Sequence, residues 1–548
     1  MRFLPAGDSA VLVELDDLAH TLALHRALLA QPVPGIRELV PAAQTLLVQY
    51  RPAGIALPAL VAALRDRAVS AAVRVTQATP TAARVVEIPV RYDGEDLPDV
   101  AELLGIPVQE VIARHTGQPY DAAFAGFAPG FVYLAGGHPG FQLPRRKTPR
   151  TRVPAGSVAL AGHFSAVYPS ASPGGWQLIG VTDVPMWDLG RPEPAYVQPG
   201  FRVQFVDAGR QRTHVSLPAT SRASPAREPE PARATAKDDA AGATGAAVIE
   251  VVAPGLQTLV QDTGRHGLSG LGISASGALD VGAMRQANRM VGNPADTPVL
   301  ENLLGRLQLR CHGRATLAVA GATAALTLRN AAGAEWPVAA EQAVALDDGD
   351  LLTVQAPSAG VRCYVAVRGG WQVAPVLGSC ATDTLAQIGP AALQAGQRLA
   401  VGAAVPRQVL RATQDAAPSP ALPRAGDEVV LDVLLGPRTD WFTPEAVQLL
   451  GTQAWQVTPQ SSRIGVRLAG AQPLARSRHD ELPSEGTVVG AIQVPASGQP
   501  VLFLADHPLT GGYPVIAAVA RHHLDLAGQI PVGCSVRFNV IAPFTAPA

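Results

Sequence analysis

The sequence predicts a mainly β protein, in which closed or sandwiched sheets follow a small α+β domain. The chain has 548 residues, several times the usual domain length of about 150 residues, so several domains are expected. Short apolar runs are separated by many of the 53 glycines and 49 prolines, a pattern typical of short strands joined by tight turns. In the second half, only residues 282–291 have a convincing helical pattern.

The first half begins with the predicted α+β domain, residues 1–82. Apolar spacing predicts a strand at 10–15, a helix at 18–29, strands around Leu39 and Val48, and a helix at 57–68. Residues 83–216 form the next predicted domain. It begins with a strand at 85–92 and helical patterns within 96–116, and short strands split by glycine and proline follow.

Two breaks divide the rest of the chain. Residues 217–247 are rich in Pro, Ala, Arg, Glu, Ser and Asp and have no aromatic residue or apolar period, so they are predicted to be a linker between two folded halves. Residues 403–428 contain four prolines and form a weaker break. This second break separates two predicted lobes of the second half, residues 248–402 and 429–548.

Three short motifs occur in the first half and recur in the same order near the C-terminus. If they reflect a duplication, each half contains a related β domain; the alternative is that they are ordinary turn-to-strand signals. The motifs are V-P-A at 153–155 and 494–496, G-G-aromatic at 174–176 and 511–513, and G-x-x-V-x-F at 200–205 and 533–538.

Composition and charge exclude several functions. The net charge is -1, which offers no electrostatic attraction to nucleic acids or acidic membranes, so neither is expected as a partner. Only Lys147 and Lys237 among the 43 basic residues are lysines, and no G-x-x-x-x-G-K-[ST] loop occurs. A phosphate-binding lysine loop, a Schiff base and a biotinyl carrier are therefore not predicted for this chain.

The cysteines and the N-terminus indicate the cell compartment. The four cysteines form no C-x-x-C pair, so we expect buried thiols in a reducing environment and no metal site of that type. The first residues lack a basic region followed by a long apolar run, which is the pattern of a secretory leader. We therefore expect the protein in the cytoplasm.

A basic loop in the first half is the best candidate for anion binding. Residues 145–152 contain five cations in eight positions, and the planar guanidinium of arginine suits carboxylates and phosphates. Arg145 and Arg150 are the predicted ligands of such a group, unless the loop is merely solvated. The turns that follow bring Ser157, His163 and Tyr168 to the same predicted rim, where His163 is either a general acid or base or a structural hydrogen-bonding residue.

The second half contributes a further set of polar residues among glycines. Asp262 either orients a cation or proton donor or caps its own turn, and Arg265 follows it closely. Farther along, two arginines four residues apart and two polar, glycine-rich segments are candidates for substrate or anion contacts. These candidates are Arg463, Arg467, Gln493 and Tyr513.

Several of these motifs together resemble a known pair of protein families. G-F-x-P-G-F-x-Y-L from Gly126, V-P-A-G-S-V and S-P-G-G-W resemble allophanate hydrolase subunit 1 proteins. Q-D-x-G-R from Gln261, A-N-x-x-V-G-N, S-x-R-x-G-x-R-L, G-A-I-Q-V-P and T-G-G-Y-P resemble subunit 2 proteins. These families include the B and C subunits of bacterial ATP-dependent 5-oxoprolinase and are related to the carboxyltransferase region of urea carboxylase.

The resemblance implies cyclophilin-like β-barrel domains in both halves: one at residues 83–216 and two lobes at 248–402 and 429–548. The two halves would form one intramolecular complex with the ligand cleft near their interface. It further implies a hydrolase that opens 5-oxoproline to L-glutamate together with a separate A-type subunit. ATP with Mg would then be bound by that subunit, or by arginines and backbone amides of this chain. Two alternatives remain: a carboxyltransferase-like module acting on urea or a related amide in a urea carboxylase or allophanate hydrolase system, and an inhibitor of a histidine kinase.

Overall fold

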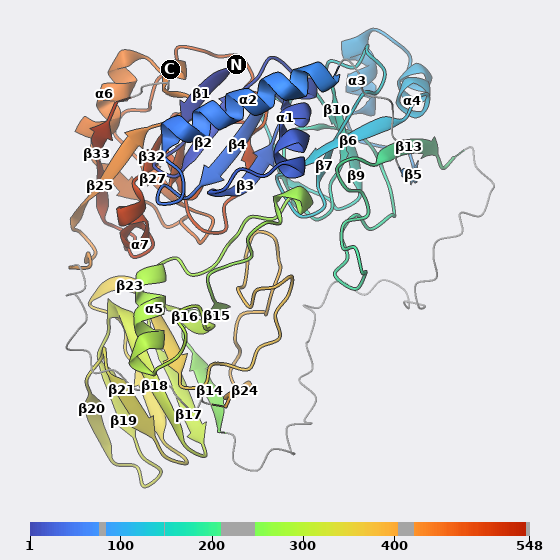
Figure 1. Cartoon of the computed structure of the whole chain (residues 1–548). Coiled ribbons are helices and arrows are strands. Elements are labelled where there is room, and N and C mark those ends of the chain that lie inside the picture. Colours follow the sequence, from blue (N-terminus) through green and yellow to red (C-terminus); the bar gives the residue numbers. More distant parts are fainter. Residues whose placement is uncertain (76–83, 147, 210–246, 404–420, 544–548) are drawn as a thin grey trace.

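The computed structural model describes residues 1–75, 84–146, 148–209, 247–403 and 421–543 (Figure 1). Almost all of the predicted linker, much of the second predicted break, and Lys147 lie outside these residues. All four cysteines are buried free thiols, as predicted. Within the described ranges, no helix combines the length and apolar character needed to cross a membrane.

The first domain is the α+β unit that the sequence predicts. Helices α1 (Leu18–Ala30) and α2 (Leu57–Val75) cover one face of its sheet (Figure 1). The Asp17 side chain accepts the His20 N–H at 2.8 Å and so caps α1. The sheet consists, in spatial order, of β1 (Arg2–Pro5), β2 (Ala10–Glu14), β4 (Thr45–Tyr50) and β3 (Ile36–Pro41).

The second domain is a seven-stranded sheet whose two edges meet. Arg91, just after β5, bridges Val181 of β12, and this contact closes the sheet into a barrel. Its strands, in spatial order, are β12 (Gln177–Val181), β9 (Ser157–Ala161), β10 (Phe164–Val167), β7 (Val132–Ala135), β6 (Tyr120–Ala125), β13 (Arg202–Asp207) and β5 (Val85–Val90). The remaining elements are α3 (Leu97–Leu104), α4 (Val108–Thr116) and the ribbon of β8 (Arg150–Val153) with β11 (Ser172–Gly174).

The third domain has two sheets that enclose one apolar core, and α5 (Val281–Met290) packs on β18 and β23. One sheet has the order β20 (Glu335–Val338), β19 (Leu326–Arg329), β22 (Leu351–Val354), β17 (Leu307–His312), β14 (Val248–Pro254) and β24 (Arg398–Ala400). The other has the order β15 (Gln257–Gln261), β16 (Val299–Leu303), β23 (Ala359–Val367), β18 (Ala315–Thr323) and β21 (Ala343–Leu346). The lobe at residues 248–402 thus has two sheets and not the closed barrel that the resemblance implies for it; the closed barrel of the second half is in the last lobe.

The last lobe is a closed seven-stranded barrel with a largely apolar interior. Its strands, in spatial order, are β25 (Glu428–Leu435), β32 (Val515–Val519), β29 (Ala491–Gln493), β30 (Val501–Phe503), β27 (Gly465–Ala469), β26 (Trp455–Val457) and β33 (Ser535–Ala542). It also contains α6 (Pro444–Thr452), α7 (Leu524–Ala527) and the ribbon of β28 (Glu485–Gly486) with β31 (Thr510–Gly511).

The two barrels share one topology, which confirms the predicted duplication. Both contain one parallel pair, β13 with β5 and β33 with β25, and both carry a separate two-stranded ribbon. From that pair, the order β5-β13-β6-β7-β10-β9-β12 corresponds strand for strand to β25-β33-β26-β27-β30-β29-β32.

Two of the three repeated motifs occupy equivalent positions in the barrels. The G-G-aromatic turns lie at β11 and β31, and the G-x-x-V-x-F runs enter β13 and β33. The V-P-A motifs are not equivalent, because residues 153–155 precede β9 whereas residues 494–496 follow β29. A short turn signal of this kind can occur at either end of a strand, so its recurrence here is not part of the duplication.

Candidate functional site

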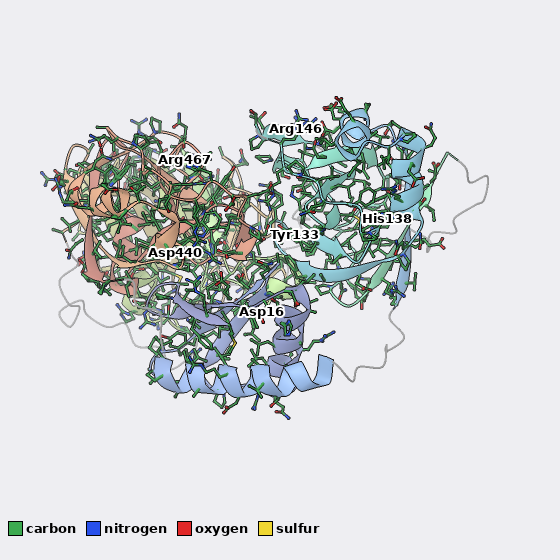
Figure 2. All side chains as sticks on the ribbon, turned by 90° about the horizontal axis from the view of Figure 1, so that it is seen from above. Asp16, Tyr133, His138, Arg146, Asp440 and Arg467 are labelled. Carbon is green, nitrogen blue, oxygen red and sulfur yellow. The ribbon has the colours of Figure 1, made fainter. Side chains whose placement is uncertain are left out.

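A cavity of about 840 Å³ lies where the first domain, the first barrel and the last lobe meet. We call it the interface cavity. In Figure 2, Tyr133 is seen at this junction. The first domain contributes Leu18 and Gln44 to the cavity wall, and the last lobe contributes Glu481 and Ser484. Ligand sites in proteins are commonly concave and located between domains, so this cavity is the leading candidate site.

Aromatic rings form the apolar wall of the interface cavity. Tyr133 of β7, Phe164 of β10 and Trp176 of the G-G-W turn all line it. The Tyr133 ring centroid lies 5.5 Å from that of Trp176 and 5.6 Å from that of Phe164, with edge-to-face geometry. The Tyr133 hydroxyl lies 3.1 Å from Ser484 Oγ, a contact between the two halves. This wall suits the hydrocarbon part of a small ligand.

Arg145 provides the positive charge of the interface cavity. Its Nε lies 3.0 Å from Glu481 Oε1, and its backbone N–H donates to Glu481 Oε2 at 3.2 Å. Its Nη2 donates to Ser484 Oγ at 3.1 Å. The guanidinium also lies against Gly512 of the T-G-G-Y motif, where an added Cβ would be 2.3 Å from Nη1. The glycine therefore makes room for an arginine from the other half.

His163 lies at the exposed mouth of the same cavity. Its Nδ1 is 3.1 Å from the carbonyl oxygen of Phe141, so Nδ1 carries the proton and donates this hydrogen bond. In the neutral ring this arrangement leaves Nε2 as a proton acceptor. His163 and Arg145 are thus the two predicted site residues that the structure brings together in the interface cavity.

The two other residues predicted for this rim are buried in the same domain and do not line the cavity. Ser157 is buried in β9, and Tyr168 is packed edge-to-face with Phe127 and Phe131. Burial raises the pKa of the Tyr168 hydroxyl above its usual range. Their positions indicate packing roles.

Arg150 differs from Arg145 because the carboxylate that engages it is buried. Its Nη1 and Nη2 donate to the two oxygens of Asp96 at 2.9 and 2.8 Å. Arg146 also pairs with Asp96, whose side chain is 2% exposed. Burial raises the pKa of Asp96, but the hydrogen bonds from Arg150 and from the Leu178 N–H outweigh this effect and the net pKa is lowered. The predicted anion ligand Arg150 therefore joins two parts of the first barrel.

Asp262 and Arg265 of the second half also have internal partners. Asp262 accepts from the Gly264 N–H at 2.8 Å, the Ser379 hydroxyl at 2.6 Å and the Cys380 N–H at 2.7 Å. These bonds support the turn-capping interpretation of Asp262. Arg265 is 2% exposed and donates to the Ala381 carbonyl. Neither residue lines the interface cavity.

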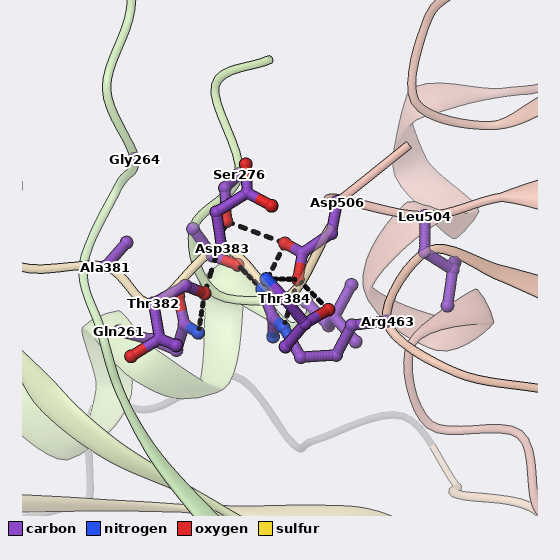
Figure 3. A network of polar contacts seen from close by, with 12 residues as sticks. Gln261, Gly264, Ser276, Ala381, Thr382, Asp383, Thr384, Arg463, Leu504 and Asp506 are labelled. Atoms are coloured by element: carbon purple, nitrogen blue, oxygen red, sulfur yellow. Dashed lines mark hydrogen bonds and ion pairs between the residues drawn. The ribbon is translucent and has the colours of Figure 1, made fainter. Parts of the chain in front are cut away.

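Arg463 is the centre of a buried charge cluster between the two lobes of the second half (Figure 3). It donates to Asp506 Oδ2 through Nε at 3.0 Å and to Oδ1 through Nη2 at 2.9 Å, and it pairs with Glu301 of β16 through Nη1. Burial lowers the pKa of Arg463, but the charges of Asp506 and Glu301 raise it by more. The net pKa is therefore raised, and the guanidinium stays positively charged. Asp506 in turn accepts from Ser276 Oγ at 2.6 Å.

The other three candidates of the second half, Arg467, Gln493 and Tyr513, belong neither to the interface cavity nor to the charge cluster around Arg463. Arg467 is exposed on β27. Gln493 donates to the Tyr513 carbonyl at 3.1 Å, and the Tyr513 ring has the Arg476 guanidinium 5.8 Å from its centroid. None of the three lines the interface cavity.

Sequence reasoning missed two residues of the site, Glu481 and Ser484. They belong to an S-R-H-D-E-L-P-S segment that is indistinguishable from an ordinary solvated loop in sequence. Phe164 and Trp176 were also not selected, although Trp176 belongs to the G-G-W motif. Their position in the cavity depends on the packing of one half against the other.

Comparison with known proteins identifies the family. Residues 271–540 match the model of the carboxyltransferase domain, subdomain A and B, and residues 1–197 match that of subdomain C and D. The chain belongs to the carboxyltransferase-domain family. It is 35% identical over 295 residues to the C subunit of 5-oxoprolinase from Escherichia coli K12, covering 53% of this chain and 90% of that protein.

Further relatives match the other half or the whole chain. The B subunit of 5-oxoprolinase from Escherichia coli O157:H7 is 38% identical over 209 residues, which are 36% of this chain and 93% of that protein. Urea amidolyase of Lachancea kluyveri is 32% identical over 54% of this chain but only 17% of its own length. A crystal structure of TTHA0988 has a TM-score of 0.76 and 35% identity, covering 97% of this chain and 99% of that one.

These matches confirm the resemblance drawn from the motifs. The carboxyltransferase-family chain contains, fused in one polypeptide, segments that correspond to two separate subunits in other proteins. The relatives are parts of enzymes, and the fold is mainly β with barrels in both halves.

Proposed function

We propose that this chain is a fused B–C component of an ATP-dependent 5-oxoprolinase, which opens 5-oxoproline to L-glutamate together with a separate A-type subunit. The observation that carries the proposal is that the chain covers at least 90% of two relatives named as 5-oxoprolinase subunits, one with each half. The interface cavity, at the junction of these halves, supports it. The four free thiols fit the cytoplasm as its compartment.

The interface cavity suits 5-oxoproline in three respects. Arg145 offers a charge-assisted contact to the substrate carboxylate. The rings of Tyr133 and Trp176 contact the methylene groups of the lactam. His163 Nε2 accepts a proton from the attacking water, while the C–N bond of the lactam breaks and the leaving nitrogen takes up a proton.

ATP binding is assigned mainly to the A-type subunit. The sequence has no lysine loop for phosphates, and in the basic loop Arg146 and Arg150 are paired with Asp96. These two arginines are therefore not free to bind the phosphates of a nucleotide. ATP with Mg, bound on the A-type subunit next to the exposed mouth of the cavity at His163, would supply the driving force for opening the lactam.

Reconstitution tests the proposed function. The full chain alone should give negligible glutamate from 5-oxoproline, and addition of the A-type subunit should give glutamate in an ATP-dependent manner. A parallel reaction contains urea, bicarbonate and a biotinylated carrier protein. Carboxylated urea in that reaction, together with no glutamate in the first, would favour a carboxyltransferase-like module. The matches to the carboxyltransferase-domain models and to a urea amidolyase make this the second candidate.

A pair of arginine variants tests the assignment of the carboxylate contact. Arg145→Ala should weaken 5-oxoproline binding about tenfold, because it removes a charged hydrogen-bond donor worth about 1.5 kcal/mol or more. Arg150→Ala should leave binding within about twofold but lower the melting temperature, because Asp96 loses two hydrogen bonds while buried. Calorimetric binding and thermal unfolding measure the two effects. Equal loss of affinity in both variants would contradict the assignment.

A further inference from the structure

Arg145, which lines the interface cavity, is already in contact with a carboxylate of the chain itself. Glu481 Oε1 lies 3.0 Å from Arg145 Nε, and Glu481 Oε2 accepts the Arg145 backbone N–H at 3.2 Å. Both carboxylate oxygens are therefore held by two donors of one residue. This is the contact that a ligand carboxylate would make, so Glu481 stands where such a group would bind.

Arg145 does not depend on Glu481 for its position. Its Nη2 donates to Ser484 Oγ and its Nη1 to the Leu482 carbonyl at 3.5 Å. Gly512 leaves the space that the guanidinium fills. If Glu481 leaves, these contacts keep the guanidinium in place, and Nε and the backbone N–H become free donors.

Glu481 can leave by rotation of its side chain alone. Its side chain is 45% exposed, whereas the next residue, Leu482, is 4% exposed in the core of the last lobe and Ser484 is 5% exposed. The backbone is thus anchored directly beside a half-exposed carboxylate. An exposed ion pair of this kind is worth only about 0.2–1 kcal/mol, so a ligand can displace it at little cost.

We propose that Glu481 is an internal competitor for the carboxylate subsite at Arg145, displaced when a small carboxylic acid enters the interface cavity. The identity of that acid as 5-oxoproline rests on the proposed function; the displacement itself does not. Glu481 thereby selects for ligands that carry a carboxylate, because a neutral ligand cannot replace its contact with Arg145.

Binding to the full chain tests the competition. Glu481→Gln should bind 5-oxoproline about two- to fivefold more tightly than the wild type, since the competing ion pair is removed. Its affinity for 2-pyrrolidinone, which lacks the carboxylate, should not change. Asp480→Asn is the matched control: this exposed neighbour makes no ion pair with any residue that the structure describes, and its removal should leave both affinities unchanged. If the wild type binds 5-oxoproline measurably and Glu481→Gln binds it equally or more weakly, the proposal is overturned.

Chemical labelling tests the displacement without the substrate. Phenylglyoxal modification of Arg145, followed by peptide mass spectrometry, should be faster in Glu481→Gln than in the wild type and Asp480→Asn, and acetate should slow it in Glu481→Gln. Equal labelling in all three proteins would overturn the proposal even if the reconstituted enzyme forms glutamate. Faster labelling of Glu481→Gln with slowing by acetate, but without 5-oxoproline binding to any variant, would support the competition and reject the proposed substrate.

Discussion

Replacing Arg463 with methionine is expected to lower the free energy of unfolding of the second half by about 3–5 kcal/mol. Arg463 is 3% exposed, and its partners Asp506 and Glu301 are 0% and 4% exposed. Removal of the guanidinium leaves Asp506 buried without its cation and Glu301 with only the longer pair to Arg362 at 3.6 Å, so both carboxylates are desolvated on folding with less compensation. The substitution also removes one link between the two lobes, because Glu301 belongs to β16 and Asp506 to the last lobe.

Urea unfolding of the full chain, with hydrogen exchange in β16 and β27 to identify the transition, measures this effect. Arg467→Met is the matched control on the same segment: Arg467 is exposed, and its replacement should change the free energy by less than about 0.5 kcal/mol. Adding Asp506→Asn and Glu301→Gln to Arg463→Met should recover part of the loss, because buried negative charge that has lost its main cation is removed. An Arg463→Met protein as stable as the Arg467→Met control would show that the cluster contributes little.

The barrels could be predicted from sequence because their signals are local. The Gly-Gly-aromatic turns and the G-x-x-V-x-F runs mark strand ends, and they recur at equivalent places in both barrels. The closure of the first barrel was not readable in the same way. It depends on the bridge between Arg91 and Val181 and on the backbone hydrogen bonds of Gly94 and Asp96 to β12, which join segments far apart in the chain.

The site was less predictable because it depends on which carboxylate each arginine meets. Arg145 and Arg150 belong to one basic loop, and their sequence context does not distinguish them. Asp96 engages Arg150 from 54 positions away, whereas Arg145 extends to the other half and meets Glu481, 336 positions away. Arg463 was selected as a ligand contact for its charge, yet its two acidic partners give it a structural role.

Asp383 is expected to make stability depend on pH in the opposite sense to an ordinary paired carboxylate. It is 1% exposed, and its Oδ2 has no hydrogen-bond partner among the described residues. Burial first, and then the charge of Asp506, raise the pKa of Asp383 from 3.8 to about 6. The folded state therefore binds this proton more tightly than the unfolded state. Its ionised form costs stability above about pH 6, and that cost disappears as the pH falls toward 4.

Asp383→Asn should consequently stabilise the protein at pH 8 by up to about 3 kcal/mol, since each pKa unit corresponds to about 1.4 kcal/mol. The Asn side-chain oxygen can still accept the N–H groups of Leu385 and Ala386, at 3.0 and 2.8 Å in the wild type. The gain should shrink as the pH is lowered from 6 and vanish near 4, when urea unfolding is repeated across this range. Asp188→Asn is the control and should change stability by less than about 0.5 kcal/mol: this turn aspartate accepts the Gly190 N–H, its side chain is 44% exposed, and its ion pair with Arg191 at 3.6 Å is at the surface. A gain in stability that is the same at every pH would contradict this prediction. It would mean that the shape or hydrogen bonding of Asp383, and not its buried charge, destabilises the folded state.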